Sequence, residues 1–124
     1  MARPVKNIAV PRRGDVYLVR LDPTIGAEIK KTRPAVVIQN DIANRASPIT
    51  IVAAITSQVD EELYPTDVLI RRGEAGLRST SVVLLNQLRS VDRRRLLRRL
   101  GSLDSRTMAR LNQALAISVG LVEL

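Results

Sequence analysis

Two apolar, largely β-branched runs, 33–40 and 49–56, each have a polar residue at one end: Arg33 starts the first run and Thr56 ends the second. Neither run needs its polar residue to form a strand. Each run has the composition and length of a buried strand. If the two strands pair antiparallel as neighbours, the start of the first lies beside the end of the second. Arg33 and Thr56 then meet, and a guanidinium beside a hydroxyl is suited to binding phosphate. Taken singly, a strand-end salt bridge would explain Arg33, and local β propensity would explain Thr56.

Together the two side chains could support metal-free cleavage of RNA, in which the 2′-OH of the substrate attacks the adjacent phosphate. Arg33 suits charge stabilisation because a guanidinium stays charged and presents up to five donors. The same high pKa makes it a poor base. Thr56 can donate to a non-bridging oxygen or orient the leaving group. The proton carrier stays open between Glu28, in the first predicted loop, and a water held by Arg33.

The chain contains no His and no Cys. This excludes a two-histidine ribonuclease mechanism, Ser-His and Cys-His nucleophile pairs, disulfides and thiolate metal sites. We therefore expect neither a metal nor a cofactor. No apolar run approaches the roughly 18 residues of a membrane span, and no apolar segment follows the charged N-terminus. We expect a cytoplasmic protein with no membrane contact.

The 124-residue chain has a net charge of +8, and all of its 20 basic residues except Lys6, Lys30 and Lys31 are Arg. Arg binds phosphate bidentately and stacks on bases, which favours a polyanionic partner such as single-stranded RNA. A solvated surface is the alternative for any single Arg. One cluster has two interpretations, a solvated face or an electrostatic docking strip for a polyanion such as RNA: Arg93, Arg94, Arg95, Arg98 and Arg99.

Strand and turn signals predict a small antiparallel β-barrel closed by one helix, in the α+β class with mainly β content. The predicted strands are 13–21, 33–40, 49–56, 66–70 and 80–87, the last extendable to 91, with one possible helical turn in 41–48. Residues 92–100 could start as a helical turn capped by Asp92, and Asp104 caps the final helix.

The final helix has an apolar stripe at three- and four-residue steps, formed by Met108, Leu111, Leu115, Val119 and Val122. This spacing is typical of a helix packed on one face. Residues 1–11 contain two prolines and have no clear period. We expect them to form a flexible N-terminal arm outside a single domain at 12–124.

Five collinear blocks of the sequence resemble the MazF/PemK family of bacterial toxins. They are Arg13-Gly-Asp-Val-Tyr17, Arg33-Pro34, Gln39-Asn40-Asp41, the strand end at Thr56, and Ser81-Val-Val-Leu-Leu-Asn-Gln-Leu-Arg89. The resemblance implies an SH3-like barrel with a final strand from about residue 97 and a C-terminal helix, usually as a homodimer. It implies a ribosome-independent endoribonuclease that cuts mRNA at a short motif and leaves 2′,3′-cyclic phosphate and 5′-OH ends. It also implies neutralisation by a cognate, acidic MazE-like antitoxin, whose acidic tail is, beside RNA, the second partner that the arginine cluster could dock.

The resemblance implies Arg33 and Thr56 as the catalytic pair. Tyr17, in mid-strand, is expected in the core, whereas Tyr64 is either a stacking platform for a base or part of a surface turn. Four predicted substrate-binding residues match family positions near the RNA groove: Gly26, Ala27, Ser81 and Gln87. The other predicted substrate-binding residues are Tyr64 and the charged residues of the first loop, Glu28, Lys30 and Lys31.

Two functions from other classes compete with this reading. One is a non-enzymatic binding toxin on the same barrel, such as the gyrase-poisoning CcdB proteins. The other is a basic barrel that binds RNA or DNA structurally. Arg33 and Thr56 at meeting strand ends argue against the first, because a pure protein binder needs neither. Only an endoribonuclease predicts discrete cuts in single-stranded RNA in the presence of EDTA.

Overall fold

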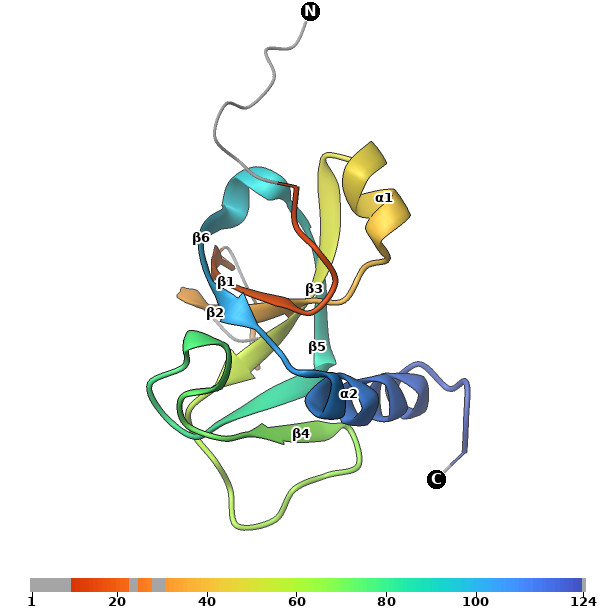
Figure 1. The fold of residues 1–124 in the computed structure, drawn as a ribbon. Coiled ribbons are helices and arrows are strands. Elements are labelled where there is room, and N and C mark those ends of the chain that lie inside the picture. Colours follow the sequence, from red (N-terminus) through yellow and green to blue (C-terminus); the bar gives the residue numbers. More distant parts are fainter. Residues whose placement is uncertain (1–9, 23–24, 28–30, 124) are drawn as a thin grey trace, which may run out of the picture.

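The computed structural model describes residues 10–22, 25–27 and 31–123, and the structural statements below refer to these residues (Figure 1). No helix among them is long and apolar enough to cross a membrane. In chain order the elements are β1 (Asp15–Arg20), β2 (Thr32–Val37), α1 (Asp41–Ala46), β3 (Ile49–Thr56), β4 (Asp67–Ile70), the short 3-10 helix η1 (Glu74–Gly76), β5 (Ser81–Asp92), a second one η2 (Arg93–Arg95), β6 (Leu96–Ser102) and α2 (Ser105–Ser118).

The six strands form one antiparallel sheet in the order β4-β5-β3-β2-β1-β6. This sheet and the C-terminal helix confirm the predicted class. The sheet curls without closing, because β4 and β6 remain its two edges. η1 packs against β6 instead: a Cβ on Gly76 would lie 2.2 Å from the Leu100 carbonyl oxygen, and one on Gly101 would lie 2.6 Å from the carbonyl carbon of Ala75. Only glycine permits this contact between backbones.

Side chains on the two faces of the sheet belong to two separate cores. Along β3, Ala53 and Ile55 point to the core that includes Leu111 of α2. Val52 and Ala54 point to the second core, lined by β1, β2 and β6. This alternation is the two-residue period of a strand buried on both faces.

The second core contains the buried aromatic residue Tyr17, which is 6% exposed, as the sequence predicted. Burial raises the pKa of its phenol. The neighbouring side chains of this core are aliphatic, as expected from a chain with two Tyr, no Phe and no Trp.

Local hydrogen bonds explain where the strands begin and end. β3 has the predicted bounds, but β1 starts at Asp15 and not at residue 13, because Gly14 (φ 94°) and an Asp15 to Arg12 backbone bond form a turn first. β2 ends at Val37 because the next two amides, of residues 38 and 39, both donate to the Ile51 carbonyl. The regular ladder stops where one acceptor serves two donors.

The C-terminal helix is shorter than its predicted apolar stripe. α2 ends at Ser118, where Gly120 (φ 78°) donates to the Ile117 carbonyl at 3.1 Å, and Leu121 donates to Ala116 at 2.8 Å. This left-handed glycine cap terminates the helix. The prediction that Val119 and Val122 continue the stripe is therefore wrong; both lie beyond the helix and are about half exposed.

Candidate active site

β2 and β3 bring Arg33 and Thr56 to the same end of the sheet. Their register pairs Ala35 with Ala54 and Val37 with Val52. Continuing this antiparallel register by two residues places Arg33 opposite Thr56, on the same face of the sheet. Both side chains are half-buried. The predicted pairing of the two strands is confirmed, and the catalytic role of the pair stays a prediction.

Aliphatic residues surround this pair on the sheet. Val19 of β1 is opposite Arg33, and Val82 of β5 is opposite Thr56. Val19, Val82 and Ala54 are almost fully buried. The polar pair therefore lies at the rim of the second core, where lower polarity strengthens a charge-assisted hydrogen bond.

A local hydrogen bond orients the hydroxyl of Thr56. Its Oγ1 accepts from the backbone N–H of Gln58 at 3.1 Å, just after the end of β3. A hydroxyl that accepts a bond still carries its own hydrogen and can donate it. Thr56 can therefore contact a phosphate oxygen without losing the bond that positions it.

The base of the first loop is fixed beside this site. Lys31 adopts a left-handed conformation (φ 67°), its N–H donates to the Asp22 carboxylate at 2.9 Å, and its carbonyl accepts from Leu21 at 3.0 Å. Gly26 (φ 61°) and Ala27 are exposed. The two other predicted residues of this loop, Glu28 and Lys30, lie outside the described residues.

β5 contributes two further predicted substrate-binding residues, Ser81 and Gln87, which differ in burial and in their local backbone. Ser81 is 4% exposed, and its hydroxyl donates to the Ser79 carbonyl at 2.8 Å. Gln87 is half-buried in an irregular stretch where the β3–β5 register shifts between Ala53 and Ala54. The structure thus gives Ser81 a structural bond and leaves its predicted contact with RNA untested.

Sequence reasoning did not single out Arg89 as a neighbour of the site. Arg89 pairs with Val52 on the face that carries Thr56, and its Nη1 donates to the Leu21 carbonyl at 2.7 Å. This bond joins β5 to the start of the first loop. No local sequence signal marks it, because the partners are 68 residues apart.

Tyr64 lies in a fixed turn with its ring exposed. Its N–H donates to the Asp67 carboxylate and its carbonyl accepts from the Asp67 N–H, both at 2.9 Å. The side chain is 68% exposed. A rigid turn that presents an exposed ring is compatible with base stacking, and this role stays a prediction.

The block at residues 39–41 has a structural role in the connection from β2 to β3. Asn40 caps α1 by accepting from Ala43 at 2.8 Å. The side chain of Gln39 donates to Asn44 at 3.0 Å and to the Ile49 carbonyl at 2.9 Å. Asn44 is fully buried and also accepts from the Thr50 hydroxyl at 2.7 Å. These bonds fix the start of β3, and so the register on which Thr56 depends.

The arginines of the cluster contact different parts of the protein. Arg99 contacts the buried Asp15 at 3.3 Å, and Arg94 pairs with Asp92 at 3.0 Å. Arg95 donates to the carbonyls of Arg20 and Asp22, which holds the end of β1. Arg93 donates to the Asn44 carbonyl at 3.4 Å. These four residues therefore make bonds within the protein, and the docking role of the cluster stays a prediction.

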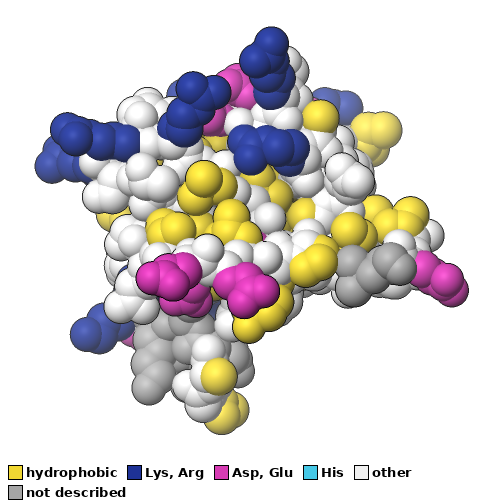
Figure 2. Space-filling model, turned by 90° about the horizontal axis from the view of Figure 1, so that it is seen from below, with side chains coloured by type: hydrophobic (Ala, Val, Ile, Leu, Met, Phe, Trp, Pro, Cys, Tyr) yellow, Lys and Arg dark blue, Asp and Glu magenta, His cyan; other side chains and the backbone are white. Residues whose placement is uncertain are grey.

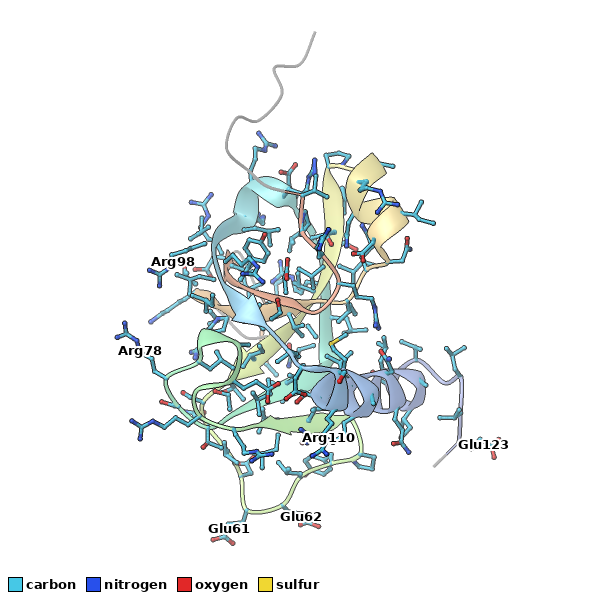
Figure 3. All side chains as sticks on the ribbon, in the orientation of Figure 1. Glu61, Glu62, Arg78, Arg98, Arg110 and Glu123 are labelled. Carbon is cyan, nitrogen blue, oxygen red and sulfur yellow. The ribbon has the colours of Figure 1, made fainter. Side chains whose placement is uncertain are left out.

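Arg98, the remaining member of the cluster, projects outward on the same side of the molecule as Arg78 (Figure 3). A contact with an anionic partner is therefore open to Arg98. In the described part of the chain, no three His, Cys, Asp or Glu residues lie close enough together to hold a metal ion.

Residues 12–119 match the family described as "PemK-like, MazF-like toxin of type II toxin-antitoxin system". The chain belongs to this family. Endoribonuclease EndoA of Bacillus subtilis (strain 168) is 44% identical over 114 residues, which is 92% of this chain and 98% of that protein. Endoribonuclease MazF of Staphylococcus saprophyticus is 46% identical over 110 residues, which is 89% of this chain and 92% of that protein. The resemblance drawn from the sequence is confirmed.

Solved structures of MazF-like proteins share the fold. MazF from Deinococcus radiodurans superposes with a TM-score of 0.78 at 26% identity, covering 90% of this chain and 98% of that one. A mycobacterial endoribonuclease, solved in complex with its cognate antitoxin, has a TM-score of 0.75 at 24% identity. That alignment covers 92% of this chain and 99% of the mycobacterial chain.

Proposed function

We propose that this MazF-like toxin cleaves single-stranded RNA, mRNA in particular, at a short sequence motif, without a metal ion. The observation that carries the proposal is the placement of Arg33 opposite Thr56 in a chain that matches the toxin family over nearly its whole length. The endoribonuclease class agrees with the names of the relatives from Bacillus and Staphylococcus.

In the proposed reaction the 2′-OH attacks the adjacent phosphorus and displaces the 5′-oxygen of the next nucleotide. The products are a 2′,3′-cyclic phosphate and a 5′-OH end. Arg33 stabilises the added negative charge on the non-bridging oxygens. The hydroxyl of Thr56, oriented by Gln58, donates to the same phosphate or to the leaving oxygen.

The reaction also needs a base for the 2′-OH and an acid for the leaving oxygen. Neither Arg33 nor Thr56 fits these roles at neutral pH. Glu28 and a water held by Arg33 are the candidates. The substrate itself would lie across the strand ends, with Gly26, Ala27, Lys30 and Lys31 of the first loop on one side. The other predicted contacts are Tyr64, Ser81 and Gln87.

We further propose a homodimer in the cytoplasm, neutralised by a cognate acidic antitoxin that occupies the RNA groove. A mycobacterial neighbour in fold was solved with its own antitoxin, which supports a partner of this kind. Residues 12–124 would form the single catalytic domain, and residues 1–11 a flexible arm outside it.

Incubation of the purified protein with single-stranded RNA in the presence of EDTA tests this function. Discrete cuts with 5′-OH ends are expected, and primer extension would give the motif. Strict dependence on added Mg²⁺ would contradict the mechanism. Intact RNA combined with inhibition of gyrase would favour a CcdB-like binding toxin, and RNA binding without cuts would favour a structural RNA-binding protein.

A further inference from the structure

A cavity of about 590 Å³ lies between the segment that precedes β1 and helix α1. Three arginines, Arg12, Arg13 and Arg45, line it together with one acidic residue, Asp41. Arg12 and Arg45 are exposed. Val10 and Pro11 supply an apolar wall. The charge of the lining is therefore positive, which suits an anion.

The Asp41 carboxylate of the cavity is already used by the protein. Asp41 accepts from the backbone N–H of Arg13 at 2.7 Å and from the side chain of Asn44 at 3.4 Å. The Arg13 bond, with nearby Arg12 and Arg45, lowers the pKa of Asp41, so it stays charged at neutral pH. Asp41 thus joins the segment before β1 to α1, the two sides of the cavity.

The guanidinium of Arg13 is held in a fixed orientation. Its Nε donates to the Ile38 carbonyl at 2.8 Å, which fixes the plane of the group at the cavity wall. A donor fixed before binding loses little conformational entropy when it contacts a ligand. The cavity therefore combines one guanidinium held by the protein with two exposed arginines.

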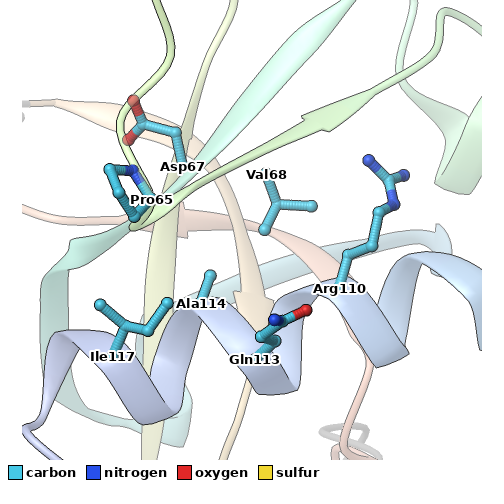
Figure 4. Close-up of a pocket in the computed structure, with 7 residues that line it drawn as sticks. All are labelled: Pro65, Asp67, Val68, Arg110, Gln113, Ala114 and Ile117. Carbon is cyan, nitrogen blue, oxygen red and sulfur yellow. The ribbon is translucent and has the colours of Figure 1, made fainter. Parts of the chain in front are cut away.

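A second groove, between β4 and α2, is also lined by arginine but has a different charge balance (Figure 4). Arg110 lines this groove together with Asp67, and an adjoining cavity places Arg71 and Arg106 beside Glu74 and Asp104. Basic and acidic side chains balance there. This groove supplies matched control positions for an experiment.

The cavity is remote from Arg33 along the sheet. Ile38, whose carbonyl accepts from Arg13, follows the end of β2 and is five residues after Arg33, or about 17 Å at roughly 3.3 Å per residue. An RNA cut at Arg33 would reach this cavity only with nucleotides well outside the bond being cleaved.

We propose that Arg12, Arg13 and Arg45 form an outlying subsite for a backbone phosphate of the RNA substrate. The ligand is a phosphodiester, because guanidinium groups bind phosphate bidentately and the described residues that line this cavity include no aromatic side chain to stack a base. The subsite adds affinity for long RNA without reading its sequence. It rests on the proposed RNA-cleaving function, which it extends.

The test compares long and short RNA on non-cleaving protein carrying Thr56→Ala. The long RNA has about 20 nucleotides with the mapped cut site at its centre, and the short RNA keeps two nucleotides on either side of the cut. Affinity for the long RNA is measured by fluorescence anisotropy, and affinity for the short RNA by its displacement of the labelled long one. The test variant is Arg12→Ala with Arg45→Ala, and the control, with the same loss of charge, is Arg106→Ala with Arg110→Ala.

We expect the test variant to bind the long RNA about tenfold more weakly and the short RNA within twofold of the parent protein. Its slope of log affinity against log salt should become shallower by about 1.4, for two lost contacts to a single strand. The control variant should bind both RNAs as the parent does.

Equal weakening for both RNAs, equal weakening in the control, or no weakening would each overturn the subsite. Binding of inorganic phosphate that depends on Arg12 and Arg45, with long-RNA affinity unchanged, would show a small-anion site and also overturn it. If the wild-type protein neither binds nor cuts RNA, the proposed function itself fails, which is a separate result.

Discussion

At the scale of single residues, the setting of Arg33 explains why its charge would be effective. Arg33 is opposite the fully buried Val19 and lies at the rim of an aliphatic core, so less water screens a phosphate bound there. Arg33 starts its run in the extended conformation that Pro34 favours. The sequence therefore fixes the backbone of this residue as well as its charge.

Replacement of Arg33 by Ala should remove charge stabilisation of the transition state. We expect the cleavage rate to fall about 10²-fold or more, the scale seen when one oxyanion donor is lost. Arg33→Lys should restore only part of the rate, because bidentate geometry is lost. Single-turnover cleavage measures the rate, and circular dichroism checks the fold. Near-normal cleavage by the Ala variant would refute the assignment.

Replacement of Thr56 separates the role of its hydroxyl from that of its methyl group. Thr56→Ala should cripple turnover, whereas Thr56→Ser should retain much of it, because the hydroxyl oriented by Gln58 is the group in use. The same cleavage assay compares the two. A Ser variant as inactive as the Ala variant would point instead to a packing role for the methyl group.

At the scale of elements, the sequence predicts the features that depend on the local hydrophobic pattern and on turn residues. The bounds of β3 and the convergence of Arg33 with Thr56 follow from where the apolar runs end. The links made by Arg89 and Arg95 could not be predicted, because each joins segments about 70 residues apart in the chain. The end of α2 was missed because the left-handed glycine that stops it is followed by further apolar residues.

The buried Asn44 connects α1 to β3, so its replacement should lower the stability of the whole fold. Asn44→Ala removes the oxygen that accepts from the Thr50 hydroxyl and that is one of the two acceptors of the Gln39 side-chain amide, which keeps its bond to the Ile49 carbonyl. We expect the free energy of unfolding to fall by about 1–3 kcal/mol, measured by denaturant titration. Asn112→Ala, at an exposed position on α2, is the matched control and should change stability by less than about 0.5 kcal/mol. An equal effect in both would contradict the network.

The N-cap residue of α2, Asp104, makes the stability of the protein depend on pH. The Thr107 N–H, donating to Asp104 at 2.8 Å, lowers the pKa of this carboxyl. The stabilisation is therefore present above the unfolded pKa of about 4 and is lost as pH falls through the lower, folded value.

Asp104→Asn keeps a capping oxygen but cannot titrate. We expect a melting temperature near the parent value at pH 7 and a shallower decline between about pH 5 and pH 2. Asp104→Ala, which loses the cap, should melt lower at pH 7 as well. An acid decline identical to the parent in the Asn variant would show that the cap is not coupled to protonation.

At the scale of the whole molecule, the net charge of +8 is distributed unevenly over the surface. Figure 2 shows one face on which hydrophobic side chains gather in the middle, with basic side chains along the top and acidic ones below. Glu61 and Glu62 project from the loop after β3, on the side of the molecule away from α1 (Figure 3). A polyanion approaching this protein is therefore attracted to particular regions and repelled from others.

RNA binding should weaken steeply as salt rises, because each phosphate contact releases counterions. An antitoxin that fills the same groove should be acidic and should compete with RNA, with Arg33 common to both. A Thr56→Ala variant allows both ligands to be measured at equilibrium, with labelled RNA displaced by unlabelled antitoxin. The displacement should itself weaken at high salt, since both ligands use the same cations. Simultaneous binding of RNA and antitoxin at one site would show that the shared groove is wrong.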